Sequence, residues 1–329
     1  MRIISICFFI TVCLLVYSNV YPQNKIKHFI FFSQDRERIK NSIFYLNPGI
    51  TGAQVTYPWK QLEPQKGKYD FTAIEEDLAF LRSKGKRLFI QIQDVTFDST
   101  LYAVPKYILR DTVYHGGVNS QYEFTKDNKA IKAGWVARRW DAAVAERFHL
   151  LLRKLAARFD GKIEGINLPE SSVDFSEKAE LIPAGFTIIN YTKALKANML
   201  EVKKDFVHSI SIQYANFMPG DSKASLQELY NYAKRIKIGM GGPDIIVYRK
   251  YQMENSYPMI REISGTVTTG MAVQEGNYDV IDPKTGKKVL VTEILDFAKY
   301  YLKLDYIFWC TEDPYYTKEV LPLLKSLKQ

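Results

Sequence analysis

Two short stretches decide how this chain is expected to fold: IEGINLPE, from Ile163 to Glu170, and TGMAVQEGNY, from Thr269 to Tyr278. Each contains a short apolar run that is followed by a glutamate, Glu170 in the first stretch and Glu275 in the second. Short apolar runs of this kind predict buried strands. If both strands belong to one parallel barrel, their carboxyl ends meet at the same rim. The two carboxylates would then face each other across one cleft.

The rest of the chain alternates short apolar strands with amphipathic helices, and the two stretches occupy the fourth and seventh strand positions. The expected strands are 27–33, 52–57, 87–93, 162–168, 209–214, 236–240, 266–274 and 306–309. Such alternation indicates a parallel sheet, and eight units favour closure into a single (β/α)8 TIM barrel. A doubly wound open sheet is the main alternative. The 329 residues suffice for one barrel domain, which typically needs ~250.

The longest gap between expected elements runs from Asp94 to Gly134, between the third strand and its helix. It is rich in tyrosine and also contains His115. A loop of this length is uncommon in a compact domain unless it has a function. We expect it to fold over the active-site face as a lid or wall, with a surface excursion that meets no ligand as the alternative.

The first residues, MRIISICFFITVCLLVYS, have a basic start at Arg2 followed by an apolar stretch. This pattern predicts a secretory signal peptide at 1–22 and a mature barrel domain at 23–329. An uncleaved membrane anchor is the alternative. We therefore expect a secreted or periplasmic protein with no stable membrane insertion after cleavage. Since Cys310 is the one cysteine beyond the signal peptide, no internal disulfide is expected.

Charge and motifs exclude several classes of function. The formal net charge is +9, but the basic residues are scattered, so we expect no nucleic-acid partner. The four histidines show no paired spacing of the kind that binds zinc. The sequence also lacks a phosphate-binding loop, a dinucleotide fingerprint and a serine nucleophile elbow. We expect neither a metal nor an organic cofactor.

The segment TYPWKQLEPQKGKYDF, from Thr56 to Phe71, resembles the second strand–helix unit of clan A glycoside hydrolases, such as the bacterial β-galactosidases and their relatives. The matching residues are Trp59, Leu62, Glu63, Pro64, Gly67, Tyr69, Asp70 and Phe71. The resemblance implies an acid/base glutamate after strand four and a nucleophile after strand seven. Glu170 and Glu275 match these two positions, whereas Glu164 lies at the early end of its strand, away from that rim.

Two facing carboxylates are what glycoside hydrolysis requires. We expect Glu170 to protonate the leaving oxygen and Glu275 to attack the anomeric carbon of an oligo- or polysaccharide, with retention of configuration. This mechanism needs the two carboxyl groups ~5–5.5 Å apart. Two alternatives stay open: a catalytically silent carbohydrate-binding barrel, and an α/β-barrel lyase or isomerase that uses one glutamate as a base.

The sequence departs from the clan's pattern at two positions. Pro169, which has no backbone N–H, precedes Glu170 where the clan usually has asparagine, and Asn167 stands two residues earlier. The arginine that the clan often carries on strand two is missing. Polar and aromatic side chains near the strand ends and in the long loop are the predicted substrate contacts: Trp59, Gln54, Gln93, Asp94, His115, Asn167, Tyr214, Asn216, Tyr248, Tyr278 and Trp309.

Overall fold

The computed structural model describes residues 25–127, 129–175, 181–283 and 285–327. Within these ranges eight parallel strands close into a barrel, which confirms the predicted fold. Around the barrel their order is β1-β11-β10-β9-β8-β7-β3-β2. They are β1 (Lys27–Phe31), β2 (Gly52–Pro58), β3 (Arg87–Gln93), β7 (Gly165–Leu168), β8 (Ile210–Tyr214), β9 (Gly239–Gly242), β10 (Thr269–Val273) and β11 (Tyr306–Cys310). The predicted signal peptide at 1–22 lies outside the described residues.

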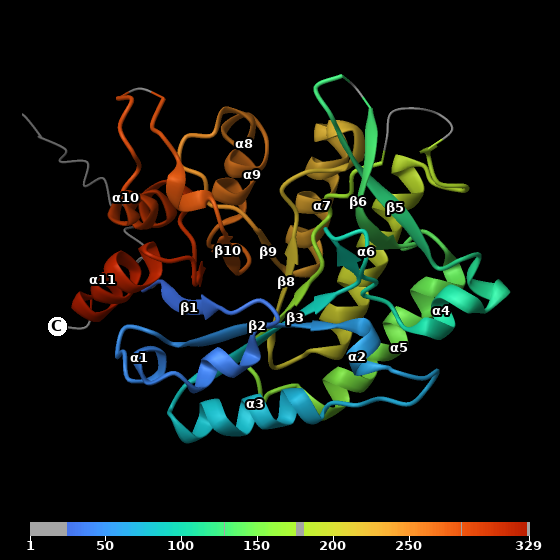
Figure 1. The fold of residues 1–329 in the computed structure, drawn as a ribbon, viewed down its shortest axis with the longest axis horizontal. Helices are drawn as coiled ribbons and strands as arrows, with labels where there is room; N and C mark the ends of the chain where they lie inside the picture. Colours follow the sequence, from blue (N-terminus) through green and yellow to red (C-terminus); the bar gives the residue numbers. More distant parts are fainter. Residues whose placement is uncertain (1–24, 128, 176–180, 284, 328–329) are drawn as a thin grey trace, which may run out of the picture.

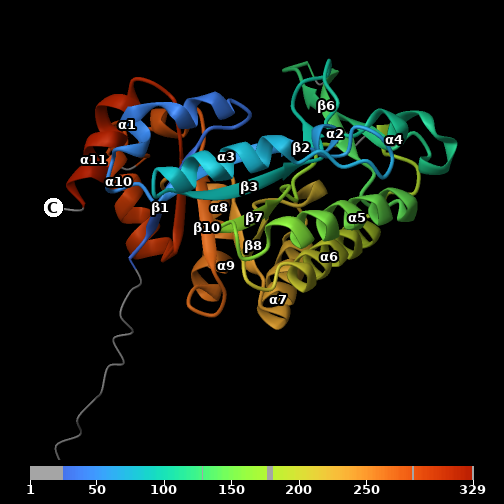
Figure 2. The same cartoon turned by 90° about the horizontal axis from the view of Figure 1, so that it is seen from below.

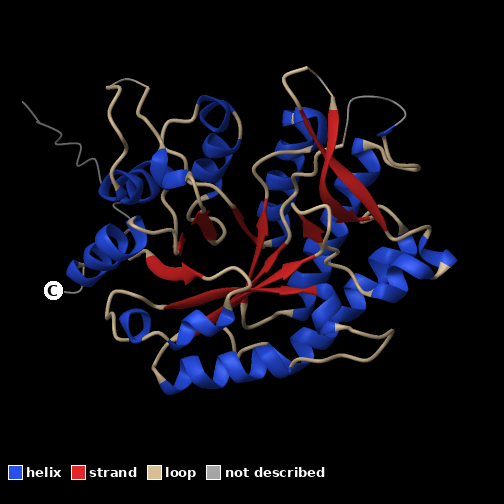
Figure 3. Cartoon of the chain, viewed as in Figure 1, coloured by secondary structure: helices blue, strands red, loops and turns tan. Residues whose placement is uncertain are grey.

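Helices connect the barrel strands and lie outside them (Figures 1 and 3). In the first half they are η1 (Arg36–Lys40), α1 (Ser42–Tyr45), α2 (Trp59–Leu62), α3 (Thr72–Ser83), α5 (Ala142–Phe159) and α6 (Ile188–Asp205). In the second half they are η4 (Pro219–Asp221), α7 (Lys223–Ile236), α8 (Lys250–Glu254), α9 (Ser256–Ile263), η5 (Asn277–Asp279), α10 (Val291–Asp296), η6 (Phe297–Leu302), η7 (Tyr316–Val320) and α11 (Leu321–Ser326). Figure 2 shows the long helices α5 and α6 packed side by side.

Side chains from alternate strand positions fill the barrel interior. This inner cluster consists of Phe29, Phe89, Ile212, Tyr214, Ala272, Tyr306 and Phe308. The intervening residues, such as Ile166, Met271 and Trp309, belong to the larger cluster between the barrel and its helices. Because successive side chains of a strand point to opposite faces, the phase of each strand determines which of its last residues reaches the mouth of the barrel.

Strand β9 consists largely of glycine, and the sequence interpretation misplaced it. The expected strand was 236–240, whereas the structure has the strand at Gly239–Gly242. A Cβ on Gly241 would lie 1.7 Å from the carbonyl oxygen of Gly270 on β10. Glycine is depleted in strands in general, but here the close approach of the neighbouring backbone requires it.

The segment that was expected to be a long loop is a folded insertion. It contains α4 (Lys106–Arg110) and η2 (Thr112–Tyr114), together with a small antiparallel sheet. The sheet has the order β4-β6-β5 and is formed by β4 (Val95–Thr96), β6 (Ala130–Ala137) and β5 (Val118–Phe124). Figure 1 shows the β5–β6 ribbon standing out from the barrel. Because β6 runs to Ala137, the next helix, α5, starts only at Ala142, with Asp141 as its N-cap.

Candidate active site

A cavity of about 190 Å³ lies at the carboxyl ends of the barrel strands. Its lining residues are Phe31, Ser33, Thr56, Gln91, Ile92, Gln93, Val95, Phe97, Pro169, Glu170, Tyr214, Pro243 and Gln274. Val95 and Phe97 come from the start of the insertion, so the insertion forms part of the wall. Because typical sites for drug-sized ligands measure ~300–1,000 Å³, this cavity suits one small ring or a similar group. In parallel barrels, this end carries the active site.

Glu170 is the acidic residue of the cavity wall. It is partly buried two residues after β7. Burial raises the pKa of its carboxyl to about 8, with further increases from the negative charges of Asp244 and Asp174 and an opposing effect of Arg139. The charged form is disfavoured because the carboxyl loses water and meets like charges. Glu170 is therefore largely protonated at neutral pH.

The backbone that carries Glu170 is held from three sides. The three successive carbonyl oxygens of residues 169–171 accept hydrogen bonds from Gln213 Nε2, Arg139 Nη1 and the Tyr191 hydroxyl, at 2.7, 2.7 and 3.0 Å respectively. These donors come from β8, the loop before α5, and α6. These bonds fix the backbone from which the Glu170 side chain extends, and a fixed backbone helps to position a catalytic group.

Arg139 forms a buried ion pair with Asp94, which was predicted to contact substrate. Arg139 Nε and Nη2 donate to the two carboxylate oxygens of Asp94 at 2.8 and 2.6 Å. Both side chains are almost fully buried. Asp94 thus orients Arg139 and does not line the cavity. Sequence reasoning missed Arg139, because it lies just beyond the insertion and outside any motif.

Glu275 lies in a neighbouring hollow of about 360 Å³. This hollow shares Phe31, Ser33 and Gln274 with the cavity of Glu170, and its other lining residues include Arg38. Glu275 is exposed. The two predicted catalytic glutamates therefore lie at the same end of the barrel, in adjoining hollows with shared walls.

The phase of β10 explains why Gln274, and not Glu275, lines the Glu170 cavity. Ala272 belongs to the inner cluster and Val273 to the outer one. Continuing the alternation of side chains directs Gln274 inward, and Gln274 does line the cavity. The sequence indicated the end of this strand correctly within one residue. It did not indicate which of the strand's side chains point into the barrel.

The structure brings part of the predicted contact set to the cavity. Gln93 and Tyr214 line it. Gln54 within β2, Asn167 within β7 and Asn216 just beyond β8 are fully buried and do not line the cavity. Gln54 donates a hydrogen bond of 3.3 Å to the Tyr214 hydroxyl and so supports a lining residue from below.

The two predicted tryptophan contacts lie in the core. Trp59 is fully buried and donates from Nε1 to Glu63 Oε2 at 3.0 Å. Glu63 is itself fully buried and also accepts from Arg147 and from the Gly67 backbone. The motif that carries the family resemblance thus forms a buried polar network beside the barrel. Trp309 faces the helices and donates to His28 Nδ1 at 3.2 Å.

Three further predicted contacts also lie away from the cavity. Tyr278 is buried against Tyr315 and donates to the Cys310 carbonyl oxygen at 3.2 Å. Tyr248 is exposed and packs on Phe297. His115 is exposed in the insertion, where its Nδ1 lies 2.7 Å from Asp141 Oδ2.

Asp244 is a carboxylate near the site that sequence reasoning missed. It follows Pro243, a lining residue of the cavity, two residues after β9. The signal was present, since an acidic residue just beyond a strand end is placed in the same way as Glu170. It was overlooked because the strand before it was expected to end at residue 240, short of Asp244.

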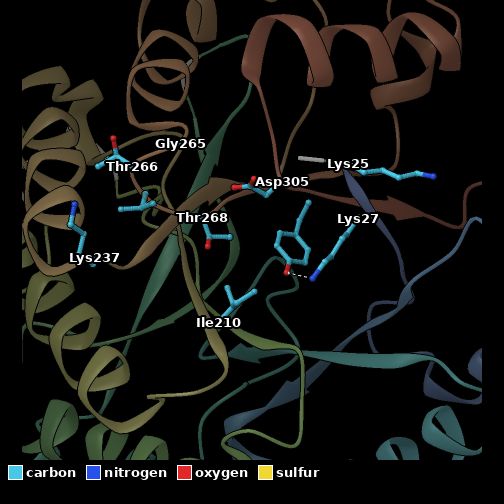
Figure 4. A pocket seen from close by; sticks show the side chains of 10 residues that line it. Lys25, Lys27, Ile210, Lys237, Gly265, Thr266, Thr268 and Asp305 are labelled. Carbon is cyan, nitrogen blue, oxygen red and sulfur yellow. Dashed lines mark hydrogen bonds between the residues drawn. The ribbon is translucent and has the colours of Figure 1, made fainter. Parts of the chain in front are cut away.

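A larger hollow of about 620 Å³ lies at the opposite end of the barrel, where the strands begin (Figure 4). Charged side chains line it: Lys25, Lys27, Lys237 and Asp305. Lys27 donates to the Tyr306 hydroxyl at 3.1 Å and to Glu164 at 2.7 Å. This location confirms that Glu164 lies away from the rim of Glu170. Because the amino-terminal end of such barrels serves stability, we do not take this hollow as the active site.

The protein shares its fold with known glycosidases. The catalytic domain of a β-amylase from Paenibacillus polymyxa superimposes with a TM-score of 0.58 at 9% identity, over 86% of this chain and 92% of that one. A β-galactosidase from the psychrophilic Marinomonas ef1 gives 0.59 at 7% identity, over 92% and 60% of the respective chains. Xylanase 10B from Thermotoga petrophila gives 0.51 at 10% identity, over 87% and 82%.

At such low identities the superpositions show a likeness of fold alone. They confirm the architecture that the family resemblance implied. This chain spans only 60% of the Marinomonas β-galactosidase. Neither a protein-family model nor a curated protein sequence matches the chain. Among the helices within the described ranges, none is both long and apolar enough to cross a membrane.

Proposed function

We propose that this protein is a retaining glycoside hydrolase in which Glu170 is the acid/base and Glu275 the nucleophile. The observation that carries the proposal is the Glu170 carboxyl, which is held at the carboxyl-terminal mouth of the barrel with its pKa raised to about 8. A general acid must hold its proton at the working pH, and a glycosidase acid has its pKa raised for this purpose. The fold shared with β-amylase, β-galactosidases and xylanase supports the same class of reaction.

Because Glu275 lies in the neighbouring hollow, the proposal requires a substrate that reaches both hollows at once. A substrate that bridges the two hollows passes over their shared wall of Phe31, Ser33 and Gln274. The aromatic ring of Phe31 offers an apolar surface for a pyranose face. An oligo- or polysaccharide chain fits this arrangement, with one ring in the smaller cavity and the chain continuing into the neighbouring hollow.

We further propose that the protein is exported. The basic and apolar start of the chain supports removal of residues 1–22 and a secreted or periplasmic location. Cell fractionation with amino-terminal sequencing of the mature protein tests this. A mature chain that still begins at Met1 in the cytoplasmic fraction contradicts it.

A panel of chromogenic glycosides tests the activity, with Glu170→Gln and Glu275→Gln compared with the wild type. Loss of the acid/base Glu170 is expected to lower kcat/KM about 10²–10⁴-fold on glycosides whose leaving group needs a proton, and loss of the nucleophile Glu275 is expected to abolish turnover of every substrate. Asp279→Asn is a matched control, because Asp279 is an exposed acid on the same rim that pairs with Lys288. Proton NMR of the first-formed product reports retention, and a 2-fluoro glycoside is expected to label Glu275.

The outcomes separate this function from its alternatives. A silent carbohydrate-binding barrel is favoured by one observation, namely that Gln274 holds the inward position at the end of β10. Binding of glycans without turnover would establish that function. An activity lost with Glu170→Gln but unchanged in Glu275→Gln would instead support single-glutamate chemistry of the lyase or isomerase kind.

A further inference from the structure

Asp244 is fixed at the mouth of the barrel beside the cavity that Glu170 lines. Its neighbour Pro243 forms part of the cavity wall. Asp244 Oδ1 accepts a hydrogen bond of 3.2 Å from Asn277 Nδ2, and the side chain is partly buried. Neither Asp244 nor Asn277 belongs to the acid/base and nucleophile pair proposed above.

Asn277 joins the loops that follow β9 and β10. While its Nδ2 donates to Asp244, its Oδ1 accepts from the Gln274 backbone N–H at 2.9 Å. The Asp244 loop is tied to β10 a second time, because Ile245 N–H donates to the Ala272 carbonyl at 2.8 Å. The Asp244 carboxylate is therefore held in a set position relative to the barrel mouth.

Three charged groups act on Glu170: Asp244 after β9, Asp174 on the loop after β7 that also carries Glu170, and Arg139 before α5. Arg139 is the group that would favour ionised Glu170. Both of the other nitrogens of its guanidinium fork are bound to Asp94. Arg139 lowers the pKa of Glu170 through its positive charge and also donates to the Glu170 backbone carbonyl.

Asp244 is placed to carry a negative charge when Glu170 does not. Burial raises the pKa of Asp244 above its ordinary value, and the Asn277 hydrogen bond and the positive charge of Arg249 limit this rise. Hydrogen bonds and positive charges stabilise the ionised form of a carboxylate. Two like charges close together resist joint ionisation, so the pair loses its protons in two separate steps.

We propose that Asp244 is a positioning residue that keeps the acid proton on Glu170, and that Asn277 holds Asp244 in place for this role. The inference rests on the proposed function, since a retained proton serves catalysis only if Glu170 is the acid. The inference gives the loop after β9 a role in the reaction, in addition to the roles of Glu170 and Glu275.

Carboxyl 13C NMR titration tests the inference without any substrate. In the wild type, the Glu170 resonance is expected to titrate near pH 8, with a smaller inflection at lower pH as Asp244 ionises. In Asp244→Asn, the Glu170 midpoint is expected to move to lower pH, by on the order of one pH unit. A midpoint equal to that of the wild type in a folded Asp244→Asn variant overturns the inference.

Two further variants keep the test decisive. Asn277→Ala removes the donor to Asp244 but leaves its charge, and it is expected to shift the Glu170 midpoint by a different amount from Asp244→Asn. Asp279→Asn removes a charge from the same rim and is expected to leave the midpoint unchanged. If Asp244→Asn does not fold, the wild-type titration decides, because a Glu170 curve without the second inflection contradicts the coupling.

The pH profile of kcat/KM links the inference to the reaction. Its alkaline limb is expected to move to lower pH in Asp244→Asn, in step with the NMR midpoint. A wild type without glycosidase activity but with the NMR shift refutes the proposed function and leaves the coupling intact. Activity with an unshifted alkaline limb in Asp244→Asn supports the function and refutes the role of Asp244.

Discussion

Arg139 joins Asp94 to Glu170. Two of its nitrogens donate to the Asp94 carboxylate at 2.6 and 2.8 Å, and the third donates to the Glu170 carbonyl at 2.7 Å. Asp94 lies at the end of β3 and Glu170 just beyond β7, so one guanidinium ties together the ends of two neighbouring strands. This planar fork fits both acceptors at once, which a lysine ammonium cannot do.

The Arg139→Met variant is expected to be much less stable than the wild type. Removing the guanidinium leaves the Asp94 carboxylate buried without its partner, which typically costs about 3–5 kcal/mol. Urea unfolding measures the loss. Arg158→Met is the control, because the exposed Arg158–Glu75 pair is expected to contribute about 0–1 kcal/mol. Equal midpoints for the two variants would contradict the structural role of Arg139.

Activity on glycosides with poor leaving groups is expected to fall as the pH rises above about 8, the pKa to which burial and Asp244 raise the Glu170 carboxyl. Below this pH Glu170 holds the proton that the leaving oxygen needs, and above it the proton is lost. The alkaline limb of kcat/KM checks this. Substrates whose leaving group needs no proton are the control and should show little or no such limb. An alkaline fall in kcat/KM of equal size for both types of substrate would argue against Glu170 as the acid.

The Trp59→Phe variant is expected to lower stability and to leave KM unchanged. Phenylalanine cannot donate to the buried Glu63 carboxylate, and a hydrogen bond to a charged group contributes about 1.5–3 kcal/mol. Thermal unfolding and KM for the best glycoside separate the two effects. Trp135→Phe, which loses a bond to the Ser99 carbonyl in the insertion, is a matched control with a smaller expected cost. A large rise in KM with unchanged stability would instead place Trp59 in the substrate site.

Protonation of Glu164 is expected to make the fold less stable in acid. Burial favours its neutral form, but hydrogen bonds from Lys27 and Tyr306 outweigh burial and lower the pKa below its ordinary value of 4.5. A carboxyl with a lowered folded pKa stabilises the protein above its unfolded pKa, and this contribution is lost as the pH falls through the folded pKa.

Urea unfolding between pH 3 and 7 checks the role of Glu164. The Glu164→Gln variant should be less stable than the wild type near neutrality and should lose less stability on acidification. Glu228→Gln, at an exposed pair with Lys196, is expected to follow the wild-type curve. Parallel curves for the wild type and Glu164→Gln would show that this carboxyl does not contribute to the acid sensitivity.

The sequence predicted the location of the strands better than their phase. The apolar run of β10 was recognised, and Glu275 follows it closely, but Gln274 is the residue directed into the cavity. Trp309 was likewise placed on the correct strand, and it faces the helices. In a strand buried on both faces, apolar residues occur at every position, so the pattern does not distinguish the two faces.

Other differences have different physical causes. The glycines of β9 are required by contacts with Gly270 and Asn216, residues far away in the sequence, so local strand propensity gave no indication of them. The position of Arg139 depends on Asp94, from which the whole insertion separates it. Local patterns predicted the barrel because it repeats a local unit, whereas the site is assembled from contacts between distant segments.

The filling of the barrel by Phe29, Phe89, Phe308 and their neighbours has a consequence for turnover. Packed aromatic rings of the described residues fill the barrel between the cavity at Tyr214 and the hollow at Tyr306 at its opposite end. A product released beside Glu170 therefore leaves at the same end of the barrel at which the substrate enters. Product and incoming ligand thus compete for this end of the barrel, where Phe97 of the insertion lines the cavity.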